Sequence, residues 1–332
     1  MIPASNISAN LEYRLNNYPS DDDLYHVVVQ KGNVGSKYVY ALQLLHSGHN
    51  IYVFRGNRQT DVNFDKSNPV LRLIGQDGNT AGGHTQTWEY ANQSGDWFVG
   101  TKPSTTDEPY WDRQIARVHI PNYNKIYYNT DLPRLSYLNR GGSQQGINYA
   151  GADMLRAEAA VSPDYQYFML ATVDRNPSDS SKGYNGYFSI YNLSDINSAL
   201  NAAGTNDVNI QNIRCVKAFM IPDFVGKIGS IQGYDIDNGA NYIYVSSQKA
   251  GDTERKIVKI PWESTDPSNW ERVDLTYNST LDEDAAGYYT ELEGIQLIDE
   301  NDLYLTVAYH RDSDKLTAMN RIYRVSWTSN IN

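Results

Sequence analysis

The chain has 332 residues, enough for one large domain, and a formal net charge of −11 from 28 Lys and Arg against 39 Asp and Glu. An acidic excess of this size argues against duplex nucleic acid or an anionic membrane as the main partner. With 40% hydrophobic and 20% charged residues, the chain is neither disordered nor a coiled coil. Cys215 is the only cysteine, which excludes an intrachain disulfide and a cysteine-based zinc site.

The sequence shows no membrane or targeting segment. Its apolar runs stay well below the about 18 residues that a membrane-spanning helix needs. Residues 1–15 lack a basic stretch followed by an apolar core, so they do not resemble an ordinary secretory signal. We therefore expect no transmembrane segment. A secretory signal was either removed, never present, or replaced by another export route.

The composition predicts an all-β fold. The 27 tyrosines favour half-buried pleated surfaces, and the 32 asparagines and 24 glycines favour turns. In chain order, β-branched and aromatic segments predict strands at Lys37–Leu44, Asn50–Phe54, Trp97–Thr101, Ile115–Ile120, Phe168–Val173, Tyr187–Tyr191, Tyr242–Ser247, Lys256–Ile260, Leu303–Tyr309 and Arg321–Trp327. One helix is predicted over Asp195–Ala203, capped by Ser194 and ended by Gly204.

A unit of three strands recurs five times along the chain. Its clearest copies begin at Arg156, Ser230 and Leu292, and looser copies begin at Val29 and Thr85. Such a unit cannot bury both of its faces alone, whereas radial stacking into a closed ring covers the faces and removes the free edges. We therefore predict a single-domain, five-bladed β-propeller, with a pair of β-sandwiches as the alternative.

The repeat also sets the expected boundaries. We place an N-terminal arm at 1–20 and the propeller at 21–332, with approximate blades at 24–55, 82–121, 155–193, 229–275 and 291–327. Because the two chain ends usually share a blade in such a ring, Leu11–Leu15 or Leu24–Val29 is expected to pair near Ile322–Trp327. The Gly-, Gln- and Asn-rich stretch Asn139–Asp153 is expected to be a surface loop.

One register position is polar in all five copies. Counting back twelve residues from Leu42, Leu170, Tyr244 and Leu305 gives Gln30, Glu158, Gln232 and Glu293, and counting back from Val99 with a slip of one residue gives Gln86. We call these five residues the channel ring. These side chains either face water in the channel or hold a sugar hydroxyl or a cation. Two carboxylates in a narrow channel recruit positive charge, and carboxylate with amide oxygens suits calcium, so Glu158 and Glu293 are the candidate calcium ligands.

Other chemical signals are weaker. The chain has no P-loop, no HExxH zinc motif and no GxSxG nucleophile elbow. His84 follows two glycines before a strand and is either a ligand contact or a hydrogen-bonded turn histidine. Asp235–Gly239 begins like a calcium loop, but Ser246 stands where that loop needs a glutamate, so a tight hairpin turn is favoured.

Aromatic residues near predicted strand ends form a candidate rim for stacking on sugars. They are Tyr110, Trp111, Tyr127 and Tyr128, and the alternative is that they fill the packing between blades. Glycoside hydrolysis would need two carboxylates at a controlled separation. Glu158 and Glu293 open two non-adjacent copies of the repeat, and the sequence does not fix the distance between them.

Several long runs carry a resemblance to a known family: Val28–Leu44, Ala81–Glu89, Gln114–Val118, Asn129–Gly141, Ala157–Tyr165, Ser230–Asp237, Tyr244–Ala250 and Leu303–His310. They resemble the helveticin J family, the large, heat-labile class III bacteriocins of lactobacilli. The resemblance covers nearly the whole chain after Val27. It implies a secreted or cell-surface protein that kills or inhibits closely related Gram-positive bacteria, exported without an obvious cleaved signal.

The resemblance supplies no catalytic residues, so three functions stay open. The protein binds an envelope glycan or surface receptor without catalysis, hydrolyses a cell-wall glycan, or serves as a surface-layer-associated adhesin. The missing acid pair and nucleophile argue against an enzyme, and the missing amphipathic basic segment argues against a pore. We expect envelope binding without catalysis, no nucleic-acid partner, and calcium as the one candidate cofactor.

Overall fold

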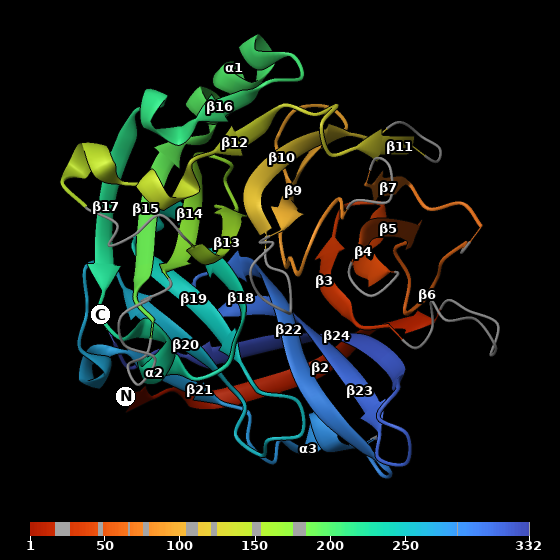
Figure 1. Ribbon diagram of the computed structural model, residues 1–332. Helices are drawn as coiled ribbons and strands as arrows, with labels where there is room; N and C mark the ends of the chain where they lie inside the picture. The colour runs from red at the N-terminus through yellow and green to blue at the C-terminus, as the bar shows by residue number, and fades with distance from the viewer. Residues whose placement is uncertain are drawn as a thin grey trace.

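The computed structural model describes residues 1–16, 27–45, 49–65, 67–75, 80–103, 112–120, 125–147, 154–174, 184–283 and 285–331. These residues form five sheets arranged in a ring, so the predicted five-bladed propeller is confirmed (Figure 1). Each predicted copy of the three-strand unit corresponds to the three inner strands of one blade. In the copy that begins at Thr85, the predicted start lies just before the observed first strand. Every blade also has a fourth strand, and of these only the strand of blade 5 that contains Leu11–Leu15 was predicted from the sequence.

The blades follow one another in chain order except for the last strand of blade 5. Blade 1 contains β3 (Val29–Val34), β4 (Tyr38–Leu45), β5 (Asn50–Asn57) and β7 (Leu71–Ile74). Blade 2 contains β8 (Trp88–Tyr90), β9 (Asp96–Pro103), β10 (Asp112–His119) and β12 (Arg134–Ser136). Blade 3 contains β13 (Met154–Val161), β14 (Tyr167–Asp174), β15 (Gly186–Asn192) and β17 (Cys215–Ile221). Blade 4 contains β18 (Ile231–Ile236), β19 (Tyr242–Ser247), β20 (Lys256–Pro261) and β21 (Glu271–Asp274). Blade 5 contains β22 (Tyr288–Asp299), β23 (Asp302–Arg311), β24 (Thr317–Thr328) and β2 (Ser5–Asn16).

Four blades gain a fifth, outermost strand from the next blade around the ring. In parallel pairings, β11 (Lys125–Tyr128) joins β7, β16 (Asp207–Asn209) joins β12, β1 (Ile2–Pro3) joins β21, and β6 (Asp61–Asn63) joins β2. Each added strand covers an edge that would otherwise be unpaired and ties two neighbouring blades together.

Blade 3 has no fifth strand within the described ranges, and side-chain amides occupy part of its edge instead. Gln144 Oε1 accepts from the Cys215 backbone N–H at 2.9 Å, and Gln145 Nε2 donates to the Cys215 carbonyl at 2.9 Å. The described part of the expected loop Asn139–Asp153, which ends at residue 147, is therefore bound to the edge of β17.

The chain ends close the ring in blade 5. β2 pairs antiparallel with β24, with Leu11 opposite Tyr323 and Tyr13 opposite Ile322. This confirms the predicted pairing of Leu11–Leu15. It also corrects the boundary after residue 20, because Ser5–Asn16 is a strand of the ring rather than part of an arm, and β24 needs it as a partner. The two termini lie near each other, joined by Asn330 Nδ2, which donates to the Pro3 carbonyl at 2.8 Å (Figure 1).

Hydrophobic side chains fill the spaces between blades. Five clusters of buried residues are present, one at each interface between neighbouring blades. The interface of blades 1 and 2, for example, contains Leu42 and Val53 from one blade and Trp88 and Val118 from the other. This arrangement uses both faces of every sheet for the core and leaves the central axis to polar groups.

Among the described residues, three α-helices lie outside the sheets: α1 (Leu193–Ala203), α2 (Phe224–Ile228) and α3 (Ser279–Asp282). The predicted helix is α1, which Gly204 ends as expected. It starts earlier than predicted, with Asn192 at the N-cap in place of Ser194, because Leu193 is already buried against blade 3. No helix in the described ranges is long and apolar enough to cross a membrane.

Truncation after Asn320 should unfold the whole domain. It removes most of β24, including Ile322, Tyr323, Val325 and Trp327, all buried. At about 1.5–3 kcal/mol for each buried side chain, the loss is comparable to the whole stability of about 5–15 kcal/mol of a typical domain. Truncation after Thr328 leaves β24 complete and is the control. A cooperative transition at the wild-type temperature in the shorter protein, measured by calorimetry, would contradict closure by this strand.

Candidate functional site

The innermost strands β3, β8, β13, β18 and β22 surround the axis, and each lies against the next around the ring. Two glycines allow the closest approach. A Cβ on Gly233 would lie 2.8 Å from the Gly294 Cα, and a Cβ on Gly294 would lie 2.9 Å from the Gln30 carbonyl oxygen. Only glycine fits at these two positions, so the axis is narrow and its polar groups must find protein partners.

The channel ring comes together at the axis as the register predicts. None of its five side chains is more than 8% exposed, so they are buried rather than facing channel water. Gln86 connects them: its Nε2 donates to Gln232 Oε1 at 3.1 Å and to Glu293 Oε2 at 2.9 Å, and its backbone N–H donates to Glu158 at 3.2 Å. Gln30 instead accepts from His84 Nε2 at 2.8 Å.

A protein cation lies beside the ring. Arg156 Nη2 donates to Gln86 Oε1 at 2.8 Å and to Glu158 Oε1 at 3.2 Å, and its Nη1 donates to the Ile231 carbonyl at 2.8 Å. Burial raises the pKa of Glu158, and Arg156 opposes that rise. The described residues contain no group of three His, Cys, Asp or Glu side chains placed to hold a metal ion. Calcium at Glu158 and Glu293 stays a prediction from the sequence.

Two neighbouring carboxyl groups, Glu291 and Glu293, interact at the same level of the axis. Burial and the neighbouring Glu291 raise the pKa of Glu293 well above its usual range. Burial also acts to raise the pKa of Glu291, but hydrogen bonds with His310 and Glu293 bring it below the usual value. His84 is half-buried, and its desolvation together with the positive charge of Arg156 lowers its pKa to about 3, which favours the neutral imidazole.

The aromatic rim predicted from sequence is described only in part. Tyr110 and Trp111 lie outside the described residues. Tyr127 is half-buried in β11 and donates through its hydroxyl to the His119 carbonyl at 2.8 Å. Tyr128, in the same strand, is 39% exposed. Both therefore lie on the outermost strand of blade 1, and neither lines the pocket described next.

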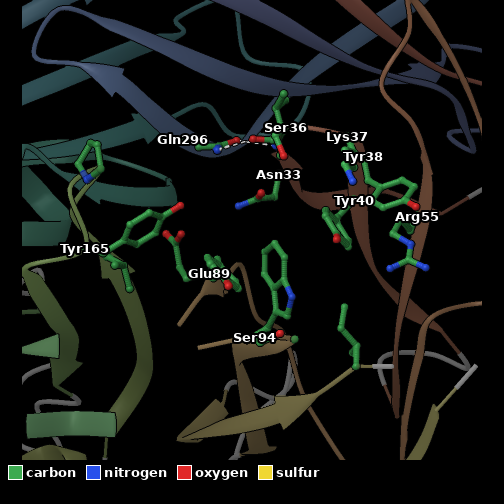
Figure 2. Close-up of a pocket in the computed structure, with 18 of the residues that line it drawn as sticks. Asn33, Ser36, Lys37, Tyr38, Tyr40, Arg55, Glu89, Ser94, Tyr165 and Gln296 are labelled. Carbon is green, nitrogen blue, oxygen red and sulfur yellow. Dashed lines mark hydrogen bonds between the residues drawn. The ribbon is translucent and has the colours of Figure 1, made fainter. Parts of the chain in front are cut away.

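A pocket of about 890 Å³, which we call the mouth pocket, lies where the inner strands end on one face of the ring. All five inner strands contribute to it, through Asn33 and Val34, Glu89 and Tyr90, Val161, Asp235, and Gln296 and Leu297. Aromatic rings form much of the wall, from Tyr38, Tyr40, Tyr90, Trp97 and Tyr165. Figure 2 shows the Glu89 side chain turned into the pocket near Tyr165 and Asn33, with Lys37 and Arg55 on the other side of the view.

The floor of the mouth pocket holds two buried carboxyl groups, which we call the acid pair: Glu89 and Asp235, 5% and 2% exposed. Lys31 Nζ, 1% exposed, donates to Glu89 Oε1 at 3.2 Å and to the Ile295 carbonyl. Asp235 Oδ2 accepts from the Leu297 backbone N–H at 2.6 Å. The ammonium of Lys31 contacts Glu89 and acts electrostatically on both carboxyl groups, and Asp235 in turn disfavours ionisation of Glu89.

Charge balance explains how the acid pair ionises. Burial raises the pKa of Glu89 to about 8 and that of Asp235 to about 6, with Lys31 opposing both shifts. One lysine can neutralise one carboxylate, so the second carboxyl group keeps its proton in this desolvated space. Near neutral pH the pair therefore carries one proton.

Sequence reasoning missed the acid pair for two reasons. Glu89 lies in β8, a strand of only three residues flanked by aromatic side chains, and no strand was predicted there. Asp235 was assigned to a hairpin turn, and the turn is present: Asp237 Oδ1 accepts from the Asn241 and Tyr242 backbone N–H groups. The register of the repeat could have identified both residues, because Glu89 and Asp235 each lie three residues after a member of the channel ring.

Comparison with known proteins identifies the family. The family model described as "Bacteriocin helveticin-J" matches residues 3–328. Bacteriocin helveticin-J of Lactobacillus helveticus is 44% identical, over 92% of this chain and 94% of that protein. The chain belongs to the helveticin J family. The resemblance predicted from the sequence is thereby confirmed.

Solved structures with a similar fold include glycoside hydrolases. A thermostable family-43 glycoside hydrolase superposes with a TM-score of 0.50 at 8% identity, over 92% of this chain and 94% of that one. An exo-β-1,3-galactanase from Phanerochaete chrysosporium gives a TM-score of 0.49 at 11% identity, over 95% of this chain and 63% of that one. At 8% identity, the likeness to the family-43 hydrolase shows a shared fold alone.

Replacing His84 by Gln should make the protein less sensitive to acid. Because folding lowers the His84 pKa from 6.5 to about 3, its stabilising contribution is complete above pH 6.5 and is lost as the pH falls toward 3. From pH 6.5 to pH 5 this loss is about 2 kcal/mol, at 1.36 kcal/mol per unit. The His84→Gln variant keeps a partner for Gln30 and lacks this loss.

Urea unfolding at pH 7 and pH 5 measures the effect. The difference in unfolding free energy between wild type and His84→Gln should shift by about 2 kcal/mol in favour of the variant at pH 5. His49→Gln, at an exposed histidine, is the control and should not change the pH dependence. Parallel pH profiles for wild type and His84→Gln would show that His84 is not held neutral by the fold.

Proposed function

We propose that the protein is a secreted or cell-surface bacteriocin that acts on closely related Gram-positive bacteria and binds a glycan of their envelope in the mouth pocket. Membership of the helveticin J family supports the bacteriocin role. The observation that carries the glycan proposal is the mouth pocket itself, where aromatic walls and convergent polar groups lie over the ends of all five inner strands.

The shape and lining of the pocket suit a carbohydrate. Tyr165 is 39% exposed at the edge of the pocket, and its ring lies edge-on to Tyr90 at 5.7 Å between centroids. An exposed aromatic face of this kind can stack on the apolar face of a sugar ring, while Asn33 and Ser36 offer hydrogen-bonding groups for hydroxyls. About 890 Å³ is within the range of small-molecule sites and leaves room for more than one sugar.

Positive charge on one side of the pocket favours a glycan with acidic substituents. Lys37 is exposed, and the Arg55 guanidinium lies over the Tyr38 ring, with Cζ 4.4 Å from the ring centroid. The chain as a whole carries −11, so a local cluster of cations is needed to attract an anionic wall polymer. We therefore expect binding to weaken as the salt concentration rises.

Replacing Tyr165 by Ala should weaken binding to target walls about tenfold. Stacking on one aromatic ring is worth about 1–3 kcal/mol, taken from base stacking as an analogue. Because the side chain is exposed, the melting temperature should stay near the wild-type value. The measurement is the depletion of protein from solution by increasing amounts of cell wall purified from Lactobacillus helveticus.

Tyr128→Ala is the matched control, because Tyr128 is also 39% exposed but lies on the outermost strand of blade 1. Under the mouth-pocket proposal it should bind as the wild type does. The aromatic rim hypothesis, which rests on Trp111 and Tyr128, predicts the reverse. Loss of binding in Tyr128→Ala with full binding in Tyr165→Ala would therefore move the glycan site to the rim.

A further inference from the structure

We propose that the acid pair, Glu89 and Asp235, hydrolyses a glycosidic bond of the glycan held in the mouth pocket. This inference rests on the glycan binding proposed above and adds a reaction to it. Both carboxyl groups line the same pocket, from blades 2 and 4, so a sugar chain lying across the channel mouth meets one group from each side.

Each carboxyl group is held in place by partners that leave it able to react. Glu89 is fixed by Lys31, and its side chain turns toward the open pocket (Figure 2). Asp235 accepts one backbone N–H on each oxygen, from Leu297 at 2.6 Å and Ile236 at 2.8 Å. A carboxylate has about four acceptor sites, so these two bonds leave room for a water molecule.

The reaction is a hydrolysis that needs no reactant other than water. Glu89 donates its proton to the glycosidic oxygen as the bond between that oxygen and the anomeric carbon breaks. Asp235 accepts a proton from a water molecule whose oxygen forms a bond to the same carbon. The products are a new reducing end and a free hydroxyl. Asp235 then releases its proton to solvent and Glu89 takes one up, which resets the pair.

Lys31 is a positioning residue in this scheme. Its ammonium touches Glu89 rather than the substrate, and it allows one of the two buried carboxyl groups to ionise. The other charged and titratable groups that act on the pair are Asp237, which disfavours ionisation of Asp235, and Tyr165, whose own pKa is raised by burial and by Glu89.

The ionisation of the pair gives the expected pH profile. Between about pH 6 and about pH 8 the pair holds one proton, which leaves one carboxyl group to donate and one to accept, the state that the reaction requires. Below this range the base is protonated, and above it the acid is ionised. The rate should therefore peak near pH 7 and fall roughly tenfold for each further pH unit on both sides.

The experiment incubates the full chain with walls purified from Lactobacillus helveticus and labels new reducing ends. The wild type should release labelled fragments with the bell-shaped profile described above. Glu89→Gln and Asp235→Asn should each reduce release by at least about 100-fold, the usual contribution of one general acid or base. Glu283→Gln, at an exposed carboxyl group that does not line the pocket, should release as much as the wild type.

The same tubes separate the two proposals, because bound protein and released fragments are both measured. Wild type that binds the wall but forms no reducing ends between pH 5 and pH 9 overturns hydrolysis and leaves glycan binding standing. Wild type that neither binds nor releases overturns both proposals. Should an acid-pair variant fail to fold, by circular dichroism, the wild-type pH profile decides: release that is independent of pH excludes the acid pair.

Discussion

The fold depends on how two buried cations satisfy the polar groups at the propeller axis. Lys31, from β3, binds Glu89 in β8 and the Ile295 carbonyl in β22. Arg156, from β13, binds the Ile231 carbonyl in β18 and the Gln86 amide just before β8. Between them these side chains connect all five innermost segments. Removing the groups that bind either cation would leave its positive charge buried without a partner, which is strongly destabilising.

The cations are needed because the hydrophobic core of a propeller is divided among the interfaces between blades. Five apolar clusters hold neighbouring blades together, and none of them covers the axis. There the strands converge so tightly that Gly233 and Gly294 have no space for a Cβ. Water has little access, so backbone and carboxyl oxygens take their hydrogen bonds from Lys31 and Arg156.

The repeated inner strands were predictable from the sequence, and most of the outer strands were not. The three inner strands recur with clear alternation, and counting along them placed Gln86 beside Glu158, Gln232 and Glu293, as the hydrogen bonds show. The outer strands are short and add little pattern, so β6, β11 and β16 could not be found, nor could their exchange between blades. Pairing of Leu11–Leu15 was predictable because ring closure is a topological requirement rather than a local preference.

The candidate site was harder to predict because its residue types change from copy to copy. Glu89 and Asp235 occupy one position of the repeat, three residues after a member of the channel ring, but the other copies have Asn33, Val161 and Gln296 there. Lys31 also follows directly after Gln30, and alternation would have turned its side chain away from the axis. A register shift between Val29 and Lys31 in the pairing of β3 with β4 changes that alternation.

The two levels of the axis differ in what they offer a ligand. The channel ring is sealed, with each side chain at most 8% exposed and most of its polar atoms engaged by Gln86, Arg156 and His84. The acid pair is as deeply buried, yet it borders an open pocket with aromatic walls. Burial raises the pKa of carboxyl groups at both levels, and in the ring hydrogen bonds and Arg156 oppose that rise. In the acid pair, folding raises the pKa of Glu89 from 4.5 to about 8, so stability is lost as the pH rises from 4.5 toward 8. The acid pair borders a space large enough for a sugar, and the same raised pKa that costs stability is what a general acid needs near neutral pH.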